Sequence, residues 1–329
     1  MSRNAQLPVR VTVEAPARLH FGVLDLRGHL GRRFGGIGAA VPVPSVRLEA
    51  VRAEGLTAEG PDSGRAQHYA RRYLEAVGRP GGAHLRVLQA IPAHVGLGSG
   101  TQLALAVARA LAELYGLSSE PLALARAVGR GQRSAIGTWT FALGGFVLEG
   151  GRRDGSSEVA PLISRLPVPA PWRCVIAIPE GPPGLSGVAE DEAFRNLPPP
   201  SEHEVERVAH LVLMQLLPAL AEGDLPAFGA ALTTVQRITG GWFAPAQGGR
   251  FAPGATAELV ARMAEFGACG VGQSSWGPAT YAIVPDADAA RDLARRVRAL
   301  LGPEAQVYET GFAARGALVH AAWAEVGRD

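Results

Sequence analysis

A glycine-rich segment at residues 92–102 constrains the fold of this chain more than any other part of its sequence. It reads PAHVGLGSGTQ, and it joins residues 84–91, which have the pattern of a strand, to residues 103–114, which are apolar on nearly every side. Glycines there let backbone N–H groups approach an anion, and the N-terminus of the following helix adds a partial positive charge. Ser99 and Thr101 can donate from their hydroxyls or cap the helix. The segment predicts an anion site, with a bare strand-to-helix turn as the alternative.

The absence of lysine limits how this chain can hold an anion. All 32 of its Lys+Arg residues are arginine, and no lysine follows the last glycine of the loop, as a Walker A motif would require. A Schiff base and a lysine phosphate clamp are therefore excluded. Arginine side chains, backbone N–H groups or a metal ion must hold any bound anion.

Hydrophobic periodicity predicts an α+β chain. A length of 329 residues leaves room for two domains, which we place at residues 1–165 and 166–329. Strands are predicted at residues 9–14, 45–52, 84–91, 142–149, 172–178, 279–284, 305–308 and 317–322. Helices are predicted at residues 64–77, 103–114, 121–128, 202–220, 226–235, 255–266 and 287–301.

Charge and composition exclude several classes of function. The formal net charge is only +2, and no basic stripe with interleaved aromatic residues occurs, so nucleic acid is not an expected partner. No stretch reaches the ~20 apolar residues of a membrane span, and the first residues lack the apolar run of a signal peptide. Cys174 and Cys269 form no disulfide framework or metal cluster, and we expect them to be small buried hydrophobic residues. A cytoplasmic enzyme is the expectation.

Three separated blocks carry a resemblance to a known superfamily. Besides GLGSG in the glycine-rich segment, they are residues 15–26 (APARLHFGVLDL) and residues 270–278 (GVGQSSWGP). Their order and spacing resemble those of the superfamily of galactokinase, homoserine kinase, mevalonate kinase and phosphomevalonate kinase (GHMP), across almost the whole chain. Within it, ARLHFGVLDL, GLGSGTQ, GRGQRSAIG and GQSSWGP look most like the beta-ribofuranosylaminobenzene 5′-phosphate synthase family.

This resemblance implies a two-domain GHMP kinase-like fold, with an N-terminal part like ribosomal protein S5 domain 2 and a C-terminal ferredoxin-like α/β part. It implies a pentosyltransferase of methanopterin biosynthesis that joins phosphoribosyl diphosphate to 4-aminobenzoate and releases CO2 and diphosphate. It also implies dependence on Mg2+ or another divalent cation, with unknown ligands, and no organic cofactor. The expected partners are these two small-molecule substrates and a second copy of the chain in a homodimer, without nucleic acid or membrane.

An ATP-dependent small-molecule kinase of the homoserine or mevalonate type is the main alternative. Such kinases often place a catalytic Asp after the second helix, but residues 129–145 contain no Asp or Glu, so a general base is missing there. The lack of lysine removes another common partner of a transferring phosphoryl group. Both absences favour a nucleophile that is an aromatic carbon, for which the protein mainly supplies positioning and electrostatic stabilisation. A catalytically inactive protein that senses phosphorylated metabolites is a third interpretation.

The candidate site residues lie mostly in the blocks that carry the resemblance. Arg18, His20 and Asp25 are the candidate catalytic residues, because Arg18 matches an oxyanion, His20 can contact the sugar or leaving group, and Asp25 can bind Mg2+ or ribose hydroxyls. The alternatives are a structural histidine and, for Asp25, a cap for the turn before Gly28. The candidate substrate-binding residues are Gly96, Gly98, Ser99, Gly100, Thr101, Gln102, Arg130, Arg133, Ser134, Gln273, Ser274, Ser275 and Trp276.

Two further groups of residues have open roles. Trp242 and Phe243, together with Trp276, can stack on an aminobenzoate ring, although core packing explains the first two equally well. Residues 190–192 (EDE) can bind a metal but are more typical of the solvated start of a helix.

Overall fold

Two β-sheets with helices packed against them make up residues 7–323, the part of the chain that this computed structural model describes. The larger sheet has eight strands in the order β12-β1-β2-β4-β3, with β5 and β6 paired to β2 and β7 paired to β5. The smaller sheet has four strands in the order β11-β8-β10-β9. The strands are β1 Arg10–Asp25, β2 Arg32–Ala53, β3 Thr57–Glu59, β4 Gly82–Gln89, β5 Phe146–Glu149, β6 Arg152–Arg153, β7 Leu162–Leu166, β8 Arg173–Ile178, β9 Gly270–Gln273, β10 Thr280–Val284, β11 Gln306–Thr310 and β12 Leu318–Ala322.

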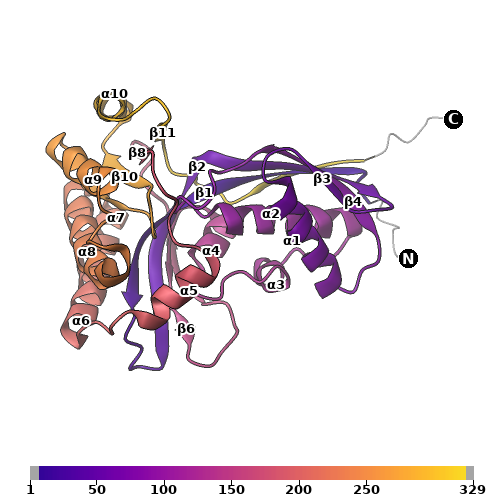
Figure 1. Cartoon of the computed structure of the whole chain (residues 1–329), viewed down its shortest axis with the longest axis horizontal. Coiled ribbons are helices and arrows are strands. Elements are labelled where there is room, and N and C mark those ends of the chain that lie inside the picture. The colour runs from indigo at the N-terminus through magenta and orange to yellow at the C-terminus, as the bar shows by residue number, and fades with distance from the viewer. Residues whose placement is uncertain (1–6, 324–329) are drawn as a thin grey trace.

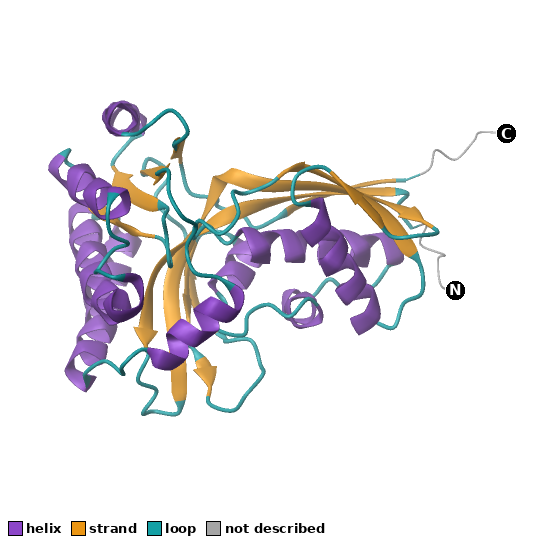
Figure 2. Ribbon diagram, in the orientation of Figure 1, coloured by secondary structure: helices purple, strands orange, loops and turns teal. Residues whose placement is uncertain are grey.

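The helices form two groups. Figure 1 shows α1, α2 and α3 together on one side of the long sheet, and α6, α8 and α9 gathered at the opposite end of the molecule, an arrangement that Figure 2 shows by secondary structure. The helices are α1 Ser63–Ala76, α2 Ser99–Tyr115, α3 Pro121–Ala127, α4 Ile136–Leu143, α5 Gly187–Asn196, α6 Glu202–Leu211, the π-helical turn η1 Val212–Leu216, α7 Leu217–Glu222, α8 Leu225–Gln247, α9 Ala255–Glu265 and α10 Ala287–Leu300.

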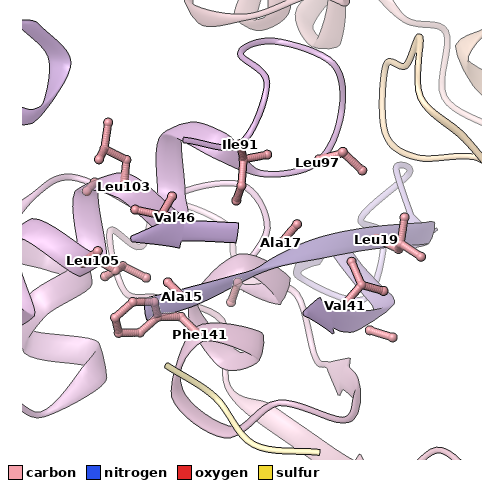
Figure 3. Close-up of a cluster of buried hydrophobic side chains, with 14 of the residues drawn as sticks. Ala15, Ala17, Leu19, Val41, Val46, Ile91, Leu97, Leu103, Leu105 and Phe141 are labelled. Carbon is pink, nitrogen blue, oxygen red and sulfur yellow. The ribbon is translucent and has the colours of Figure 1, made fainter. Parts of the chain in front are cut away.

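The main hydrophobic core lies between the large sheet and α2. Ala17 and Leu19 of β1 and Val41 of β2 are fully buried there with Leu103 and Leu105 of α2 (Figure 3). The sequence prediction of a helix buried on nearly every side is therefore confirmed. A second, smaller core lies between the small sheet and α9 and α10.

The pairing of β1 with β2 is irregular beside the site. The register shifts between Pro16 and Ala17, and again between His20 and Gly22. Such bulges bend a strand and redirect its side chains. Because side chains alternate along a strand, Leu19 enters the core while the polar side chains on either side of it face a cavity.

Most predicted elements are confirmed, but the prediction of a strand at residues 142–149 is wrong in its first half. Residues 136–143 form α4, and only residues 146–149 form β5. Gly144 and Gly145 separate the two elements with φ of 64° and 72°, values that glycine adopts without strain. The helix ends at this glycine pair. Because the residues on both sides are mostly apolar, the sequence does not reveal the change from helical to strand periodicity.

Two elements are much longer than the pattern predicts. In β2, residues 36–41 are all buried, so they lack the alternation by which a strand is recognised. In α8, small residues carry the helix past its predicted end at 235 because neighbouring backbone lies very close. A Cβ on Gly240 would lie 2.3 Å from the carbonyl oxygen of Arg250. Tertiary packing therefore sets the length of α8.

The last described strand returns to the first sheet. β12 pairs antiparallel with β1, from Arg10 opposite Ala322 to Glu14 opposite Leu318. The large sheet thus contains residues from both predicted domains, and the boundary between residues 165 and 166 stays a prediction. Within residues 7–323 no helix has the length and apolar character needed to cross a membrane.

Candidate functional site

A cavity of about 520 Å³ lies where the glycine-rich segment meets the second half of the chain. Its wall comes from β1, α5 and α8, and from residues 94–101, 129–134 and 273–277. These segments are far apart in sequence, so the fold assembles the site from nearly the whole chain.

Close backbone contacts hold the glycine-rich segment in place. The N–H of Arg18 donates to the carbonyl of Leu97 at 3.1 Å. A Cβ on Gly96 would lie 2.0 Å from the carbonyl oxygen of Ser274, so a side chain at Gly96 would force the two loops apart. Gly98, the N-cap of α2, has a left-handed φ of 78°. Packing and turn geometry therefore require glycine at positions 96 and 98, while the anion site that the sequence pattern predicts for this segment stays a prediction.

Two guanidinium groups converge on the N-terminus of α2. The helix begins at Ser99 without a side-chain cap. A Cβ on Gly100 would lie 2.8 Å from Nη2 of Arg65 and 3.2 Å from Nη2 of Arg130. Arg130 also donates to the Tyr69 hydroxyl and lies over its ring, 5.0 Å from the centroid. Uncapped helix N–H groups beside two cations make this end of the cavity attractive to a multivalent anion.

Arg18 and His20 form the β1 side of the cavity, and burial affects both. Burial lowers the pKa of Arg18 to about 10, so this guanidinium stays charged at neutral pH. Burial and then the charge of Arg18 lower the pKa of His20 to about 3, so the imidazole is neutral. Nε2 of His20 lies 3.3 Å from Oγ of Ser134. His20 can therefore exchange hydrogen bonds with a ligand but cannot pair with an anion.

A cluster of carboxylates and arginine lies on the α5 side. Arg133 forms ion pairs with Glu190 and Asp191, and Nε1 of Trp276 donates to Oε1 of Glu190 at 3.1 Å. Burial raises the pKa of Glu190, while Arg133 and Arg18 oppose that rise. These contacts attach α5 to the loop before α4 and to the loop after β9.

Four aromatic rings line one part of the cavity. Phe243 of α8 meets Trp276 edge-on with centroids 4.8 Å apart, and Phe194 of α5 meets Trp276 at 5.4 Å. Phe34 of β2 meets Phe194 at 5.5 Å with perpendicular planes. Edge-on ring contacts are a favourable geometry for aromatic side chains. This wall suits a flat apolar ligand such as a benzene ring.

Most of the predicted site residues come together in this cavity. Those that line it are Arg18, His20, Gly96, Gly98, Ser99, Gly100, Thr101, Arg130, Arg133, Ser134, Gln273, Ser275 and Trp276.

Asp25 lies outside the residues that line the cavity. Its Oδ1 accepts hydrogen bonds from the backbone N–H groups of Arg27 at 2.6 Å and Gly28 at 2.8 Å. This is the turn-capping role that the sequence offered as the alternative. A catalytic role for Asp25 stays a prediction that these contacts do not support.

Three other predicted residues are buried and do not line the cavity. Gln102 is fully buried and donates to the carbonyl of Gly137 at 3.0 Å. Ser274 is also buried, and its hydroxyl donates to the carbonyl of Gly96 at 2.7 Å. Trp242 lies in the hydrophobic core, so of the pair in α8 it is Phe243 that reaches the cavity.

Sequence reasoning missed several residues of the cavity wall, among them Phe34, Arg65, Tyr69 and Phe194, and also the buried Glu149, which does not line the cavity. Arg65 and Tyr69 lie one turn apart on α1 and line the anion end, a spacing that was visible in the sequence. Phe194 follows the acidic run on α5. Glu149 ends the apolar strand β5 and is fully buried, although a carboxylate at a strand end usually meets solvent.

The carboxylates of the cavity suit Mg2+ in combination with phosphates. Residues 7–323 contain no group of three or more His, Cys, Asp or Glu that could hold a metal by itself. Glu190 and Asp191 are the acidic side chains that line the cavity. Mg2+ is commonly bound by one or two carboxylates plus substrate phosphates. These residues therefore fit a cation that binds with a phosphorylated substrate.

Comparison with known proteins places both halves of the chain. The family model "GHMP kinases N terminal domain" matches residues 65–145, and "GHMP kinases C terminal" matches residues 216–302. The crystal structure of homoserine kinase from Cytophaga hutchinsonii superposes with a TM-score of 0.66 at 18% identity, covering 97% of this chain and 100% of that one. A likeness at this identity concerns the fold alone, and the fold predicted from the three blocks is confirmed.

Two curated relatives match this chain over most of its length. The beta-ribofuranosylphenol 5′-phosphate synthase of Methanothermobacter thermautotrophicus is 34% identical, over 94% of this chain and 99% of its own. The protein of the same name from Archaeoglobus fulgidus is 36% identical, over 82% of this chain and 87% of its own.

Proposed function

The chain belongs to the family of beta-ribofuranosylphenol 5′-phosphate synthases, with the GHMP fold, and on that premise we propose that it is a decarboxylating pentosyltransferase of methanopterin biosynthesis. It condenses phosphoribosyl diphosphate with a 4-substituted benzoate and releases CO2 and diphosphate. The observation that carries this proposal is 34% identity to a named synthase across 94% of the chain.

The acceptor is either 4-aminobenzoate or 4-hydroxybenzoate, and we propose 4-aminobenzoate first. The resemblance of the sequence blocks implies the amino compound, whereas the names of the relatives specify a ribosylated phenol, whose ring carries a hydroxyl. Both substituents push electron density onto the ring carbon that bears the carboxylate. The same chemistry therefore serves both acceptors, and the two must be compared directly.

The anion end of the cavity supports the departure of diphosphate. As the bond from ribose C1 to diphosphate breaks, negative charge grows on the leaving group. Arg65, Arg130 and the N–H groups at the start of α2 lie together there, already positioned and partly shielded from water. Preorganised donors of this kind stabilise developing charge without reorganising during the reaction.

The aromatic wall supports the binding of the acceptor ring. Phe194, Phe243 and Trp276 offer a ring the edge-on and offset contacts that aromatic groups favour. Positioning is the main requirement for attack by a ring carbon on ribose C1, because both atoms must approach closely and in line. When the carbon–carboxylate bond then breaks, its electron pair returns to the ring and restores aromaticity.

We also propose that the reaction requires Mg2+, held by the diphosphate of the substrate and by Glu190 and Asp191. When bound, the cation supplies charge neutralisation for the leaving group. Removal of divalent cations with EDTA should abolish activity, and added Mg2+ should restore it. Glu190→Gln should raise the Mg2+ concentration needed for half-maximal rate, whereas Arg126→Ala, which breaks an exposed ion pair outside the cavity, should not.

The proposed function is tested by following labelled CO2. The purified chain is incubated with phosphoribosyl diphosphate, Mg2+ and carboxyl-labelled 4-aminobenzoate, and in parallel with labelled 4-hydroxybenzoate. We expect release that needs all three components and that falls sharply in Ser99→Ala and Arg18→Ala but not in the control Arg126→Ala.

The same experiment examines the kinase alternative. No labelled CO2 from either acceptor, together with consumption of ATP in the presence of homoserine or mevalonate, would replace the proposed function by phosphoryl transfer. A homodimer and a cytoplasmic location belong to the same proposal. Light scattering of the purified chain measures its mass in solution and tests the dimer.

A further inference from the structure

Glu149 is a buried carboxylate that the proposed reaction does not use. It is fully buried at the end of β5, and its two oxygens accept from the N–H groups of Gly151 at 2.7 Å and Ala135 at 3.3 Å. Ala135 is the N-cap of α4, so the partial positive charge of that helix end also favours the carboxylate. Burying a charged carboxylate costs folding free energy unless hydrogen bonds or an opposite charge compensate it.

A chain of hydrogen bonds connects Glu149 to the cavity through Ser134. A hydrogen bond from the side chain of Ser134 lowers the pKa of Glu149, and Oγ of Ser134 lies 3.3 Å from Nε2 of His20. A serine hydroxyl carries one proton, so when it donates to the carboxylate it must accept from its other neighbours. The N–H of Ile136 is one such donor, at 3.3 Å, and Nε2–H of His20 is the other.

This arrangement determines which nitrogen of His20 carries the proton. A neutral imidazole has one N–H and one lone pair, and the hydrogen bond at one nitrogen decides the state of the other. With the proton on Nε2, the lone pair lies on Nδ1. Within residues 7–323 no hydrogen-bond partner of Nδ1 is found, and the side chain lines the cavity. Nδ1 is thus free to accept a hydrogen bond from a ligand.

We propose that Glu149 and Ser134 are positioning residues that hold His20 with its proton on Nε2, so that Nδ1 accepts a hydrogen bond from a hydroxyl or amino group of the bound substrates. This inference rests on the proposed function for its substrates, though not for the state of the imidazole. The donor is either the substituent at ring position 4 or a ribose hydroxyl, which share the same chemistry. Because the imidazole is neutral, it accepts this bond without attracting a phosphate.

Protonation of Glu149 would reverse the direction of the hydrogen bonds that link Glu149, Ser134 and His20. A protonated carboxyl group donates to Ser134, whose hydroxyl then donates to Nε2 of His20 and moves the imidazole proton to Nδ1. Burial raises the pKa of Glu149 to about 7, while the amides of Gly151 and Ala135 and the Ser134 hydroxyl oppose the rise. The lone pair on Nδ1 should therefore be present above about pH 7 and lost below it.

The charged groups near Glu149 and His20 do not themselves account for a transition near pH 7. Among residues 7–323, no charged side chain of the neighbouring β2, β7 or α4 acts on the pKa of Glu149. Arg18, beside His20 on β1, is the charged group that acts on the imidazole, and it keeps His20 neutral. A transition near pH 7 would thus report the carboxylate and not ionisation of the histidine.

Nitrogen-15 NMR of the full chain, labelled at histidine and free of substrate, tests the proposal. The chemical shifts of the two ring nitrogens distinguish a protonated nitrogen from one with a lone pair, and His20→Asn identifies the signals. We expect the proton on Nε2 at pH 8 and a shift toward Nδ1 near pH 7. Ser134→Ala should remove this transition, whereas Ser156→Ala, at an exposed turn, should keep it.

Kinetics with both acceptors identifies the donor. Ser134→Ala should lower kcat/KM about tenfold, the loss expected for one hydrogen bond, and should remove the acid limb near pH 7 from its pH profile. For His20→Ala, unequal losses with 4-aminobenzoate and 4-hydroxybenzoate identify the ring substituent, and equal losses identify a ribose hydroxyl. A proton on Nδ1 at pH 8 would overturn the proposal even if CO2 is released. The predicted tautomer without CO2 release would instead count against the proposed function alone.

Discussion

Glu149 should make the stability of this chain depend on pH near neutrality. Its pKa is about 7 in the folded chain, above the ordinary value of 4.5, because burial disfavours the charge. The folded state therefore binds this proton more tightly than the unfolded state. The resulting stabilisation is fully present below about pH 4.5 and is lost as the pH rises through about 7. The difference corresponds to roughly 3 kcal/mol in the free energy of unfolding.

Urea unfolding of the chain and of Glu149→Gln between pH 5 and 8 measures this effect. The glutamine cannot ionise, so the variant should gain stability relative to the parent as the pH rises, by up to roughly 3 kcal/mol. Its one oxygen must serve two backbone amides, which lowers its stability by an amount that does not change with pH. A difference that stays constant from pH 5 to 8 would show that Glu149 titrates normally.

Phe194 should select the acceptor and not the sugar. Its ring contacts Phe34, Phe243 and Trp276 in the aromatic wall, and the guanidinium of Arg133 lies 5.7 Å from its centroid. Phe194→Leu keeps an apolar side chain but loses the ring, whose aromatic contacts are worth about 1 kcal/mol. We expect the KM for the benzoate to rise about fivefold, with the KM for phosphoribosyl diphosphate unchanged.

Steady-state kinetics with each substrate varied in turn makes this measurement. Phe266→Leu is the matched control, because Phe266 lies under Arg296 and outside the cavity. Equal rises in both KM values for Phe194→Leu would mean that the substitution disturbs the whole cavity, and the ring would then have no particular role in acceptor binding.

Residue chemistry in the sequence located the anion end well and the acidic groups poorly. Glycine, serine and arginine next to a helix start have few other uses, and Gly96, Ser99 and Arg130 all line the cavity. Carboxylates have many uses, and Asp25 caps a turn. Glu149 gave no signal because burial, which makes it unusual, is a property of the folded chain.

At the scale of secondary structure, α5 depends on Arg133. The helix has no buried residues, and its N-cap Ser186 makes no side-chain cap. Its charged attachment comes from Glu190 and Asp191, which both pair with Arg133, in addition to the Trp276 indole on Glu190 and the ring contacts of Phe194. A helix of ten residues is only marginally stable without tertiary contacts. Arg133→Ala should therefore loosen α5 without unfolding the rest of the chain.

Hydrogen exchange measured by mass spectrometry tests this expectation. Peptides from residues 187–196 should exchange about tenfold faster in Arg133→Ala, while peptides from α2 should not change. Arg126→Ala removes an exposed ion pair to Glu158 and serves as the control. Unchanged exchange in α5 would mean that its aromatic contacts through Phe194 are sufficient to hold it.

The elements that sequence pattern missed are those whose form depends on close neighbours. Buried glycines and alanines leave no alternation along residues 36–41 of β2. Past its predicted end at residue 235, α8 continues through Gly240, where neighbouring backbone lies too close for a side chain, although glycine disfavours an isolated helix. By contrast, α1 and α10 carry amphipathic patterns of their own and were predicted to within one residue. Local pattern is sufficient where an element packs by one face and insufficient where it is enclosed.

For the molecule as a whole, motif order identified the fold, whereas pattern could not give its topology. Three blocks in a fixed order were enough to predict a GHMP fold, which the family models confirm. Nothing local indicated that the last described strand, β12, pairs in the first sheet, because that pairing joins residues about 300 positions apart. The cavity likewise depends on contacts between residues far apart in sequence, because its walls come from β1, α5, α8 and the loop after β9.

The return of β12 to the large sheet predicts that the two halves depend on each other for stability. β12 covers the edge of β1 over Arg10–Glu14, where Val11 and Val13 are fully buried. Deleting residues from 317 onward would leave the backbone donors and acceptors of that edge unpaired and open to association with other chains. We expect the truncated chain to melt several degrees lower and to aggregate at concentrations at which the full chain does not. Thermal unfolding followed by circular dichroism, with light scattering of the same samples, measures both effects. A matched truncation after residue 323 controls for loss of the terminal residues alone. If removal of β12 left both the melting temperature and the solubility unchanged, the first sheet would be stable without its last strand, and the two halves would not depend on this pairing for stability.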